Sequence, residues 1–280
     1  MVVHYYRYII QSLIFITVTI WIIAFSIPDS TLHVIACDVG QGDAILITYK
    51  NIQILTDGGA NNRVLECLSK HIPFWDREIE LVILTHPDRD HYFGLIEVVR
   101  RYKVDNFLYN KLESSSKEYK VLENEVGSRG IHSIHPNTGK RISIGLIYLD
   151  ILHPSQGFES KETNDYSIVY KLTYGKFKAI FTGDVGPDIS DSLVNNYLME
   201  RVDYIKIPHH GSRNGVTLNL LKATMPKIAV ISVGTKNSYG HPHKDISDML
   251  ESLKVKVLRT DKVGSIETIT NGREVWMKTD

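Results

Sequence analysis

The sequence predicts an α/β fold that follows an apolar N-terminal helix, and three observations point to this arrangement. Short aliphatic runs such as Leu81–Leu84 alternate with segments that have helical periodicity. Histidine and aspartate residues directly follow several of these runs, at the carboxyl ends where open α/β sheets place active sites. The chain after residue 30 contains no repeat and no long linker. We therefore expect an N-terminal segment, residues 1–29, and one domain, residues 30–280.

Residues 8–27 form the first predicted element, a run without a charged residue. As a helix it spans about 30 Å, enough for the core of a bilayer. Arg7 precedes the run and Asp29 follows it, which favours a cytoplasmic N-terminus with the rest of the chain outside. Residues 24–26 (Ala-Phe-Ser) also resemble a cleavage site, so a removed signal peptide competes with a retained anchor. A buried core helix is the third alternative.

Three strands are expected next, at residues 32–37, 44–49 and 52–56, because each is a short apolar run. A turn with two glycines, residues 38–43, joins the first two strands. The third strand ends at Asp57, which two glycines follow. An aspartate there can orient a metal-binding histidine, because glycines permit close backbone approach. A simple turn aspartate is the alternative.

The segment 85–91, Thr-His-Pro-Asp-Arg-Asp-His, carries the strongest chemical signal. It lies between the buried strand 81–84 and a helix that ends near residue 101, so its four polar groups lie at the carboxyl end of a strand. Their spacing lets a short loop aim two pairs of ligands in different directions, as a two-metal site needs. The alternative is a polar turn in which one aspartate caps the helix. The four candidates are His86, Asp88, Asp90 and His91.

The middle of the chain is predicted to contain no further ligands. Its expected helices are at residues 62–72 and 115–128, and its expected strands at 106–109, 142–144 and 146–152. We interpret His132, His135 and His153 as ordinary loop histidines.

Two more strand ends carry residues that bind metals. Strands 168–172 and 177–181 form a hairpin that runs into Asp184, and strand 204–207 runs into His209 and His210. Such repetition is hard to attribute to chance. The other elements expected in this half are helices at 189–199, 218–223 and 245–253 and strands at 228–233, 255–258 and 265–269.

Charge and cysteine content limit the class of protein. Lys plus Arg and Asp plus Glu both total 32, so the chain lacks the overall positive field of an obvious nucleic-acid binder. A local basic groove is still compatible with this zero net charge. Cys37 and Cys67 fit no metal spacing. Their places in a buried strand and a helix favour two free thiols.

Five motifs in chain order resemble the metallo-β-lactamase superfamily, and more narrowly the hydrolase domain of the ComEC-type competence proteins that import DNA in bacteria. The similarity covers residues 32–270 and lacks the large multi-span channel portion of those proteins. The motifs are Asp38-Val39-Gly40-Gln41-Gly42-Asp43, Thr85-His86-Pro87-Asp88-Arg89-Asp90-His91, Thr182-Gly183-Asp184, His209-His210-Gly211-Ser212 and Tyr239-Gly240-His241-Pro242-His243.

The resemblance implies a four-layer αββα sandwich, two mixed sheets packed face to face with helices outside, and a dinuclear site at one edge. The sequence departs from the family pattern at Asp88, where the family usually has a histidine, and around Asn164, where the family usually has an isolated histidine. It implies that His86 and Asp88 hold one metal, that Asp90, His91 and His210 hold the other, that Asp184 bridges them, and that the candidate catalytic residues are Asp90, Asp184 and His209.

The ligand set also bears on the metal. Its several aspartates make it harder than a histidine-dominated zinc site, so Mn²⁺ is expected beside Zn²⁺. Two such ions about 3.5–4 Å apart suit phosphodiester cleavage. Further candidates are expected to orient a metal ligand, contact phosphate or assist the leaving group. For the loop residues among them, an ordinary surface role is the alternative. These candidates are Asp57, Asn164, Lys206, Ser212, Arg213, His241 and His243.

These features together predict a metal-dependent hydrolase with two divalent ions, membrane-anchored through residues 8–27 or secreted, and most consistent with a phosphodiesterase or nuclease that acts on extracytoplasmic DNA. Two alternatives stay open. The first is a hydrolase of a small phosphoester such as phosphocholine. The second is a binding module, without catalysis, of a DNA-uptake or envelope complex.

Overall fold

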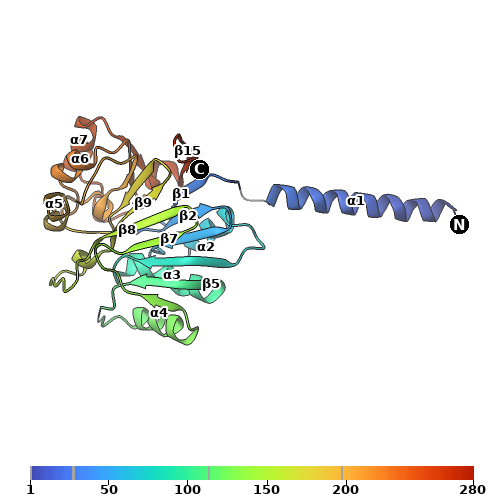
Figure 1. The fold of residues 1–280 in the computed structure, drawn as a ribbon, viewed down its shortest axis with the longest axis horizontal. Helices are drawn as coiled ribbons and strands as arrows, with labels where there is room; N and C mark the ends of the chain where they lie inside the picture. Colours follow the sequence, from blue (N-terminus) through green and yellow to red (C-terminus); the bar gives the residue numbers. More distant parts are fainter. Residues whose placement is uncertain (1, 27–28, 113, 197) are drawn as a thin grey trace.

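Two mixed β-sheets packed face to face form the body of the protein (Figure 1). The computed structural model describes residues 2–26, 29–112, 114–196 and 198–280, with side chains omitted at 2–5 and 22–26. The first sheet runs in the order β15 (Val275–Thr279), β14 (Ile266–Thr270), β1 (Leu32–Ala36), β2 (Ile45–Tyr49), β3 (Ile52–Thr56), β4 (Glu78–Leu84), β5 (Lys103–Tyr109) and β6 (His132–Ile134). The second runs in the order β13 (Lys256–Arg259), β12 (Ile228–Ile231), β11 (Tyr204–Lys206), β10 (Phe177–Phe181), β9 (Val169–Tyr174), β8 (Ile147–His153) and β7 (Arg141–Ile144).

Each sheet is parallel in one half and antiparallel in the other. Strands β3 to β6 are parallel in the first sheet, and β10 to β13 are parallel in the second. Parallel strands end at the same edge, so the loops that follow β3, β4 and β5 gather there. The turn after β1 joins them, because β1 and β3 both pair antiparallel with β2.

Helices cover the outer faces of both sheets, and three clusters of buried apolar residues separate the four layers. One cluster lies between the first sheet and α2 (Val64–His71), α3 (Arg89–Arg101) and α4 (Lys117–Ser128). Another lies between the second sheet and α5 (Pro187–Asn195), α6 (Leu218–Thr224) and α7 (Lys244–Ser252). The third fills the space between the sheets. Figure 1 shows the two helix groups on opposite sides. The expected pair of mixed sheets is confirmed.

Several element boundaries differ from the sequence expectation for local reasons. The fourth helix begins at Lys117 because the Ser116 hydroxyl accepts a hydrogen bond from the Tyr119 amide, which caps the helix. The helix expected to reach residue 199 ends at Asn195. Strands β6 and β15 were not predicted, because both are edge strands with several exposed residues. Short helices α8 (Thr260–Val263), η1 (Thr163–Tyr166) and η2 (Pro208–Gly211) complete the described elements.

The N-terminal run is helical: α1 spans Val2–Ser26 and projects away from the sandwich in Figure 1. The large apolar side chains described between Tyr6 and Trp21 are exposed. Within the residues that the structure describes, no helix is both long enough and apolar enough to cross a membrane. An anchor or signal peptide in residues 1–29 therefore stays a prediction.

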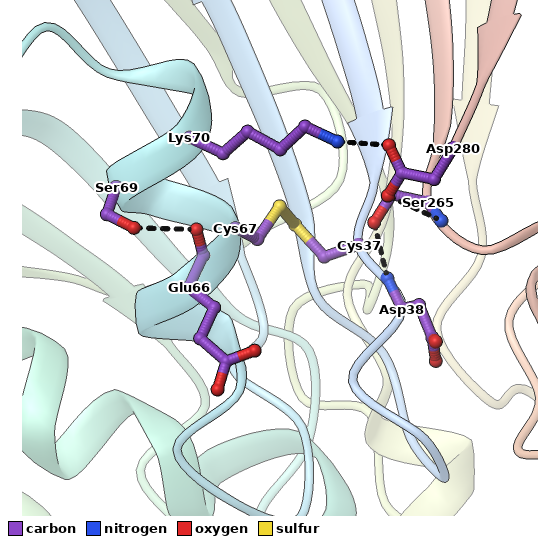
Figure 2. The surroundings of a disulfide bond; sticks show 8 residues. All are labelled: Cys37, Asp38, Glu66, Cys67, Ser69, Lys70, Ser265 and Asp280. Atoms are coloured by element: carbon purple, nitrogen blue, oxygen red, sulfur yellow. Dashed lines mark hydrogen bonds and ion pairs between the residues drawn. A yellow bond between two sulfur atoms is a disulfide. The ribbon is translucent and has the colours of Figure 1, made fainter.

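The expectation of two free thiols is wrong, because Cys37 and Cys67 form a disulfide with Cα atoms 5.9 Å apart. Helix α2 packs on the first sheet and brings Cys67 against the residue that follows β1. Figure 2 shows two further ties around this bond. Lys70 of α2 pairs with Asp280, and the Ser265 hydroxyl accepts a hydrogen bond from the Asp38 amide. The partners lie 30 residues apart in sequence, and no local pattern marks such a pairing.

Candidate metal centre

Loops from both sheets meet at their shared edge. The loop after β4 contains Thr85 and leads into α3, while the loop after β10 carries Asp184 into α5. The backbone ties the sheets together here, because the Ile168 amide donates to the Thr85 carbonyl. In the turn after β1, a Cβ atom on Gly42 would lie 1.9 Å from the Asp90 carbonyl oxygen, so only glycine fits that approach.

Asp184 lies at the centre of the histidine and aspartate cluster. Its Oδ2 is 3.3 Å from Nε2 of His91 and 3.3 Å from Nε2 of His210. The same His210 nitrogen is 3.5 Å from Oδ2 of Asp90. His86, His91 and Asp184 form a second group whose ligand atoms lie within 4.8 Å of one another. Asp184 therefore faces both groups, as expected of a bridging ligand.

His86 and Asp88 lie at the outer side of this cluster. Nε2 of His86 is 3.7 Å from Oδ2 of Asp88, whose side chain is 43% exposed. Among the described residues, Asp88 belongs to no group of three close ligand atoms. The inner site is therefore the more complete of the two predicted sites.

The cluster is suited to a divalent cation because several histidine nitrogens in it have no hydrogen-bond partner among the described residues. Nε2 of His86, His91 and His210 are all buried, and within the described chain none of them has a hydrogen-bond partner. Buried polar atoms normally find partners. Imidazole nitrogens beside carboxylate oxygens are a donor set that binds Zn²⁺ or Mn²⁺. These residues thus suit a metal better than a closed hydrogen-bond network.

The opposite ring nitrogens are held by neighbouring groups. Nδ1 of His91 lies 2.9 Å from Oδ2 of Asp57, and Nδ1 of His210 donates to the Ser232 carbonyl at 2.8 Å. Asp57 is fixed in turn by the amide and hydroxyl of Thr85, both at 2.8 Å. Because these contacts engage Nδ1, they aim Nε2 at the cluster. The contact of Asp57 is the one expected of an orienting group.

One further residue of the site, Ser167, carries no clear signal in the sequence. Ser167 Oγ lies 3.3 Å from Nδ1 of His86 and accepts the Asp184 amide at 3.0 Å. The predicted Asn164 meets this region through its backbone, since its carbonyl accepts the Ser167 amide. The hydroxyl of a serine, three residues further on, thus lies where Asn164 was expected to act.

Lys206 differs from the phosphate-contact expectation, because it is 1% exposed and enclosed by acceptors. Its ammonium pairs with Asp43, lies 3.2 Å from Oδ1 of Asp184, and donates to the Gly183 carbonyl at 3.0 Å. A long strand of DNA cannot reach this group. Asp43 was not predicted as a site residue, although it is the last residue of the glycine-rich motif 38–43. Its role depends on the ion pair with Lys206, a residue that is distant in sequence and comes close only in the folded chain.

The remaining candidates line the outer part of the centre. The ring of His209 is 5.8 Å from that of His241, which is 6.4 Å from the ring of His210. His209 and His210 both have left-handed backbone angles, with φ of 49° and 53°, and their rings are nearly perpendicular. The His243 ring nitrogen accepts the amide of Arg213 at 3.0 Å. Ser212 is buried and its hydroxyl accepts the Asn214 amide.

Opposite charges set the protonation of the cluster without a metal. Burial disfavours a charged His210, but the carboxylates of Asp184 and Asp43 raise its pKa to about 9. Burial likewise opposes charge on His91, yet Asp184 and Asp57 raise its pKa well above the usual value. Burial would raise the pKa of Asp184, but His210, Lys206 and His91 lower it well below the usual value. Protons on two histidines thus balance the acids, and a metal would have to replace them.

Four layers with a buried histidine and aspartate cluster at one sheet edge define a metal-dependent hydrolase fold. The chain belongs to the metallo-beta-lactamase superfamily, whose family model matches residues 37–235. ComE operon protein 3 of Bacillus subtilis (strain 168) is 27% identical over 249 residues, which cover 82% of this chain and 32% of that protein. Competence protein ComA of Neisseria gonorrhoeae is 26% identical over 249 residues, which cover 86% and 33%. The resemblance to competence proteins is confirmed, and the chain spans about a third of these relatives' length.

Solved structures show the same fold. The metallo-beta-lactamase fold protein YhfI from Bacillus subtilis superposes with a TM-score of 0.58 at 12% identity, covering 88% of this chain and 100% of that one. Igni18, a metallo hydrolase from the archaeon Ignicoccus hospitalis, superposes with a TM-score of 0.55 at 14% identity, covering 88% and 98%. At these identities the likeness concerns the fold alone.

Proposed function

We propose that this protein is a metal-dependent phosphodiesterase that cleaves DNA outside the cytoplasm during DNA uptake. The observation that carries the proposal is the convergence on the carboxylate of Asp184 of three buried histidine Nε2 atoms that have no hydrogen-bond partner within the described residues. A binding module without catalysis has no need of such a buried ligand set, which is costly to build.

The proposed roles follow from position. His86 and Asp88 would hold one ion, Asp90, His91 and His210 would hold the other, and Asp184 would serve both. Divalent cations would supply Lewis acidity at a phosphate and lower the pKa of water. Burial lowers the pKa of His209, so this rim histidine is neutral at pH 7 and can accept a hydrogen bond from the attacking water or donate its N–H to the leaving-group oxygen.

DNA as substrate and an external location rest on separate grounds. Relatives that cover most of this chain are called competence and recombination proteins. Exposed cations rim the loops that carry the ligands, among them Arg89 at the start of α3 and Arg213 after η2. The Cys37–Cys67 disulfide supports a location outside the cytoplasm, because disulfides persist in oxidising compartments.

A small phosphoester is the second candidate, and one observation favours it. The rim carries acids beside its cations: Arg213 lies 3.9 Å from Asp245, and Lys244 pairs with Asp248 at 2.6 Å. Such pairs weaken a field that would attract a polyanion. A small ester needs only one or two of these groups.

A double substitution separates the candidates. We expect Arg89→Ala with Arg213→Ala to lower DNA cleavage by about tenfold or more at moderate salt. The reason is that these arginines would neutralise phosphates of bound DNA, so their loss weakens DNA binding. Each lost phosphate contact should also flatten the salt dependence of duplex binding by about 0.9 log units per log of salt. Hydrolysis of a small chromogenic phosphodiester should stay nearly unchanged. The measurement uses the full chain with Mn²⁺ or Zn²⁺ on single- and double-stranded DNA.

The matched control is Lys50→Ala with Lys176→Ala, two exposed cations in the β2–β3 and β9–β10 turns at the opposite edge. This control should cleave both substrates normally. An equal decrease on both substrates in the rim variant, or no DNA cleavage by the unmodified protein with any divalent metal, would favour the small phosphoester.

A further inference from the structure

A hollow lies at the carboxyl end of β5, the strand next to the one that leads into the metal-binding loop. Its volume is about 460 Å³, within the range of pockets that bind small molecules. Three segments wall it: residues 110–112 after β5, residues 135–140 between β6 and β7, and residues 154–158 after β8. Tyr166 completes the lining.

The hollow and the metal centre share a sheet edge and a connecting segment. Leu84 and Tyr109 are partners in the β4–β5 ladder, so the chain leaves β5 next to the metal-binding loop after β4. Tyr166 immediately precedes Ser167, the residue whose hydroxyl lies 3.3 Å from His86 and accepts the Asp184 amide. A chain-like substrate held across the metal centre has this hollow as its neighbour.

The hollow is positively charged. Its described lining contains Lys111, Lys140 and His135 and no acidic residue. Lys140 donates to the His135 carbonyl at 3.1 Å, and both lysines are exposed without an ion pair to any described residue. Such cations are available to a phosphate.

Another hollow of similar size, about 450 Å³, shows what a neutralised basic pocket looks like. It contains four cations at the opposite end of β5, but each has a carboxylate partner. The distances are 2.8 Å for Arg100 and Glu125, 3.0 Å for Arg101 and Glu97, 3.0 Å for Arg129 and Glu125, and 3.1 Å for Lys103 and Asp105. Charge balance therefore singles out the hollow at the carboxyl end of β5.

Aromatic rings form the inner wall. Phe158 and Tyr166 pack edge to face with ring centroids 5.3 Å apart, and Phe158 also packs on His153 at 4.6 Å. The Tyr166 hydroxyl accepts the Ser160 amide at 2.9 Å, which fixes its ring. Both rings are partly exposed in the hollow. Rings beside free cations suit a ligand that has both a flat base and a phosphate.

We propose that this hollow binds one nucleotide of single-stranded DNA next to the bond that is cleaved, with Lys111 and Lys140 on the backbone phosphate and Phe158 and Tyr166 against the base. The assignment to a flanking nucleotide rests on the proposed function. A paired base is stacked within its duplex and cannot enter, so the hollow selects single strands or frayed ends.

Binding of a labelled oligothymidylate to the full chain, with metal chelated to prevent cleavage, tests the proposal. Lys111→Ala with Lys140→Ala should flatten the salt dependence by about 0.7 log units per log of salt, since both lysines contact one phosphate and each single-strand phosphate contributes about 0.7. Phe158→Leu should weaken binding by about tenfold and leave the salt slope unchanged. Duplex binding should change little in either variant.

The matched control is Lys117→Ala with Lys120→Ala, two exposed lysines of the neighbouring helix α4, which should bind normally. Hydrolysis of the chromogenic phosphodiester by each variant reports an intact fold and metal centre. The proposal is overturned if the hollow variants match the control, if their single- and double-strand binding weakens equally, or if the unmodified protein binds no oligothymidylate. A protein that binds oligothymidylate through the hollow but cleaves no DNA would refute the proposed function. The assignment of the hollow as a single-strand binding site would then still hold.

Discussion

At the scale of single residues, the metal centre depends on a fixed cation that no ligand motif contains. Lys206 lies between Asp43 and Asp184, and all three side chains are buried. Two adjacent carboxylates in a dry site repel each other, and the ammonium compensates them. Burial would lower the pKa of Lys206, but Asp43 and Asp184 raise it, so the lysine stays charged.

We therefore expect Lys206→Met to destabilise the metal-free protein by about 3–5 kcal/mol, because it leaves buried carboxylates without their partner. Added Mn²⁺ should restore part of this stability, since a metal also neutralises Asp184. Denaturant unfolding with and without chelator measures both effects. Lys227→Met is the control: the Lys227 side chain that pairs with Asp203 is largely exposed, so its loss should cost less than about 1 kcal/mol. Equal effects of the two variants would contradict this view.

The histidines give the stability of the metal-free protein a particular pH dependence. The pKa of His210 is about 9 in the fold, raised by Asp184 and Asp43 against the effect of burial, and about 6.5 in the unfolded chain. Its bound proton stabilises the fold fully below about pH 6.5, and this contribution is lost as the pH rises to about 9. His91 has the same sign. The lowered pKa of Asp184 acts only in acid, outside this window.

Thermal unfolding at pH 6.0, 7.5 and 9.0 should thus show a metal-free protein that becomes less stable as the pH rises. The stabilisation by Mn²⁺ should grow over the same range, because metal binding needs deprotonated imidazoles. A metal-free protein that grows more stable between pH 6.5 and 9 would refute the assigned protonation.

At the scale of elements, the disulfide fixes the segment that carries Asp43. Cys37 immediately precedes the turn 38–43, and Cys67 lies in α2, so the bond ties the turn to a helix packed on the sheet (Figure 2). The bond closes a segment of 30 residues. In the chain-entropy account, such a loop contributes about 3–4 kcal/mol.

Cys37→Ala with Cys67→Ala should accordingly lower the free energy of unfolding by about 3–4 kcal/mol, and a reducing agent should do the same to the unmodified protein. Ser69→Ala, a surface change in the same helix, should have little effect. An unmodified protein that is equally stable with and without reductant would show that the bond does not contribute.

Sequence periodicity located most of these elements but not their edges. Runs such as those of β4 and β10 are almost wholly buried, and their apolar residues mark them clearly. Strand β15 alternates partly buried and exposed residues at the edge of a sheet, so its pattern is weak. The disulfide, the Lys206 pairs and the Ser167 contact depend on long-range packing, which local patterns do not encode.

At the scale of the whole molecule, the two halves of the chain supply complementary parts of one site. The first sheet contributes Asp57, His86 and His91, and the second contributes Asp184 and His210. Strand ends carrying histidine and aspartate were visible in the sequence because each motif is local. Their assembly into one centre follows from the packing of the sheets, with the buried cluster between them holding both edges in place.

The N-terminal helix stands outside this assembly. Its described apolar side chains are exposed on a helix that projects from the sandwich, and apolar surface of this kind favours a nonpolar environment (Figure 1). No described helix meets the length and apolarity of a membrane span, so the anchor in residues 8–27 is our proposal, and this exposed apolar surface and the disulfide are its support.

We expect reporter fusions after residue 30 and after residue 280 both to register an external location, with the full chain in the membrane fraction. Ile14→Arg with Ile16→Arg should release the protein from membranes or block its export, because each arginine at a helix centre costs about 2.5–3.5 kcal/mol of insertion free energy. Ile14→Leu with Ile16→Leu keeps the helix apolar and should behave normally. A mature protein that lacks residues 1–26 would identify a signal peptide instead of an anchor. Unmodified protein found in the cytoplasm, with a reduced Cys37–Cys67 pair, would refute the external location altogether.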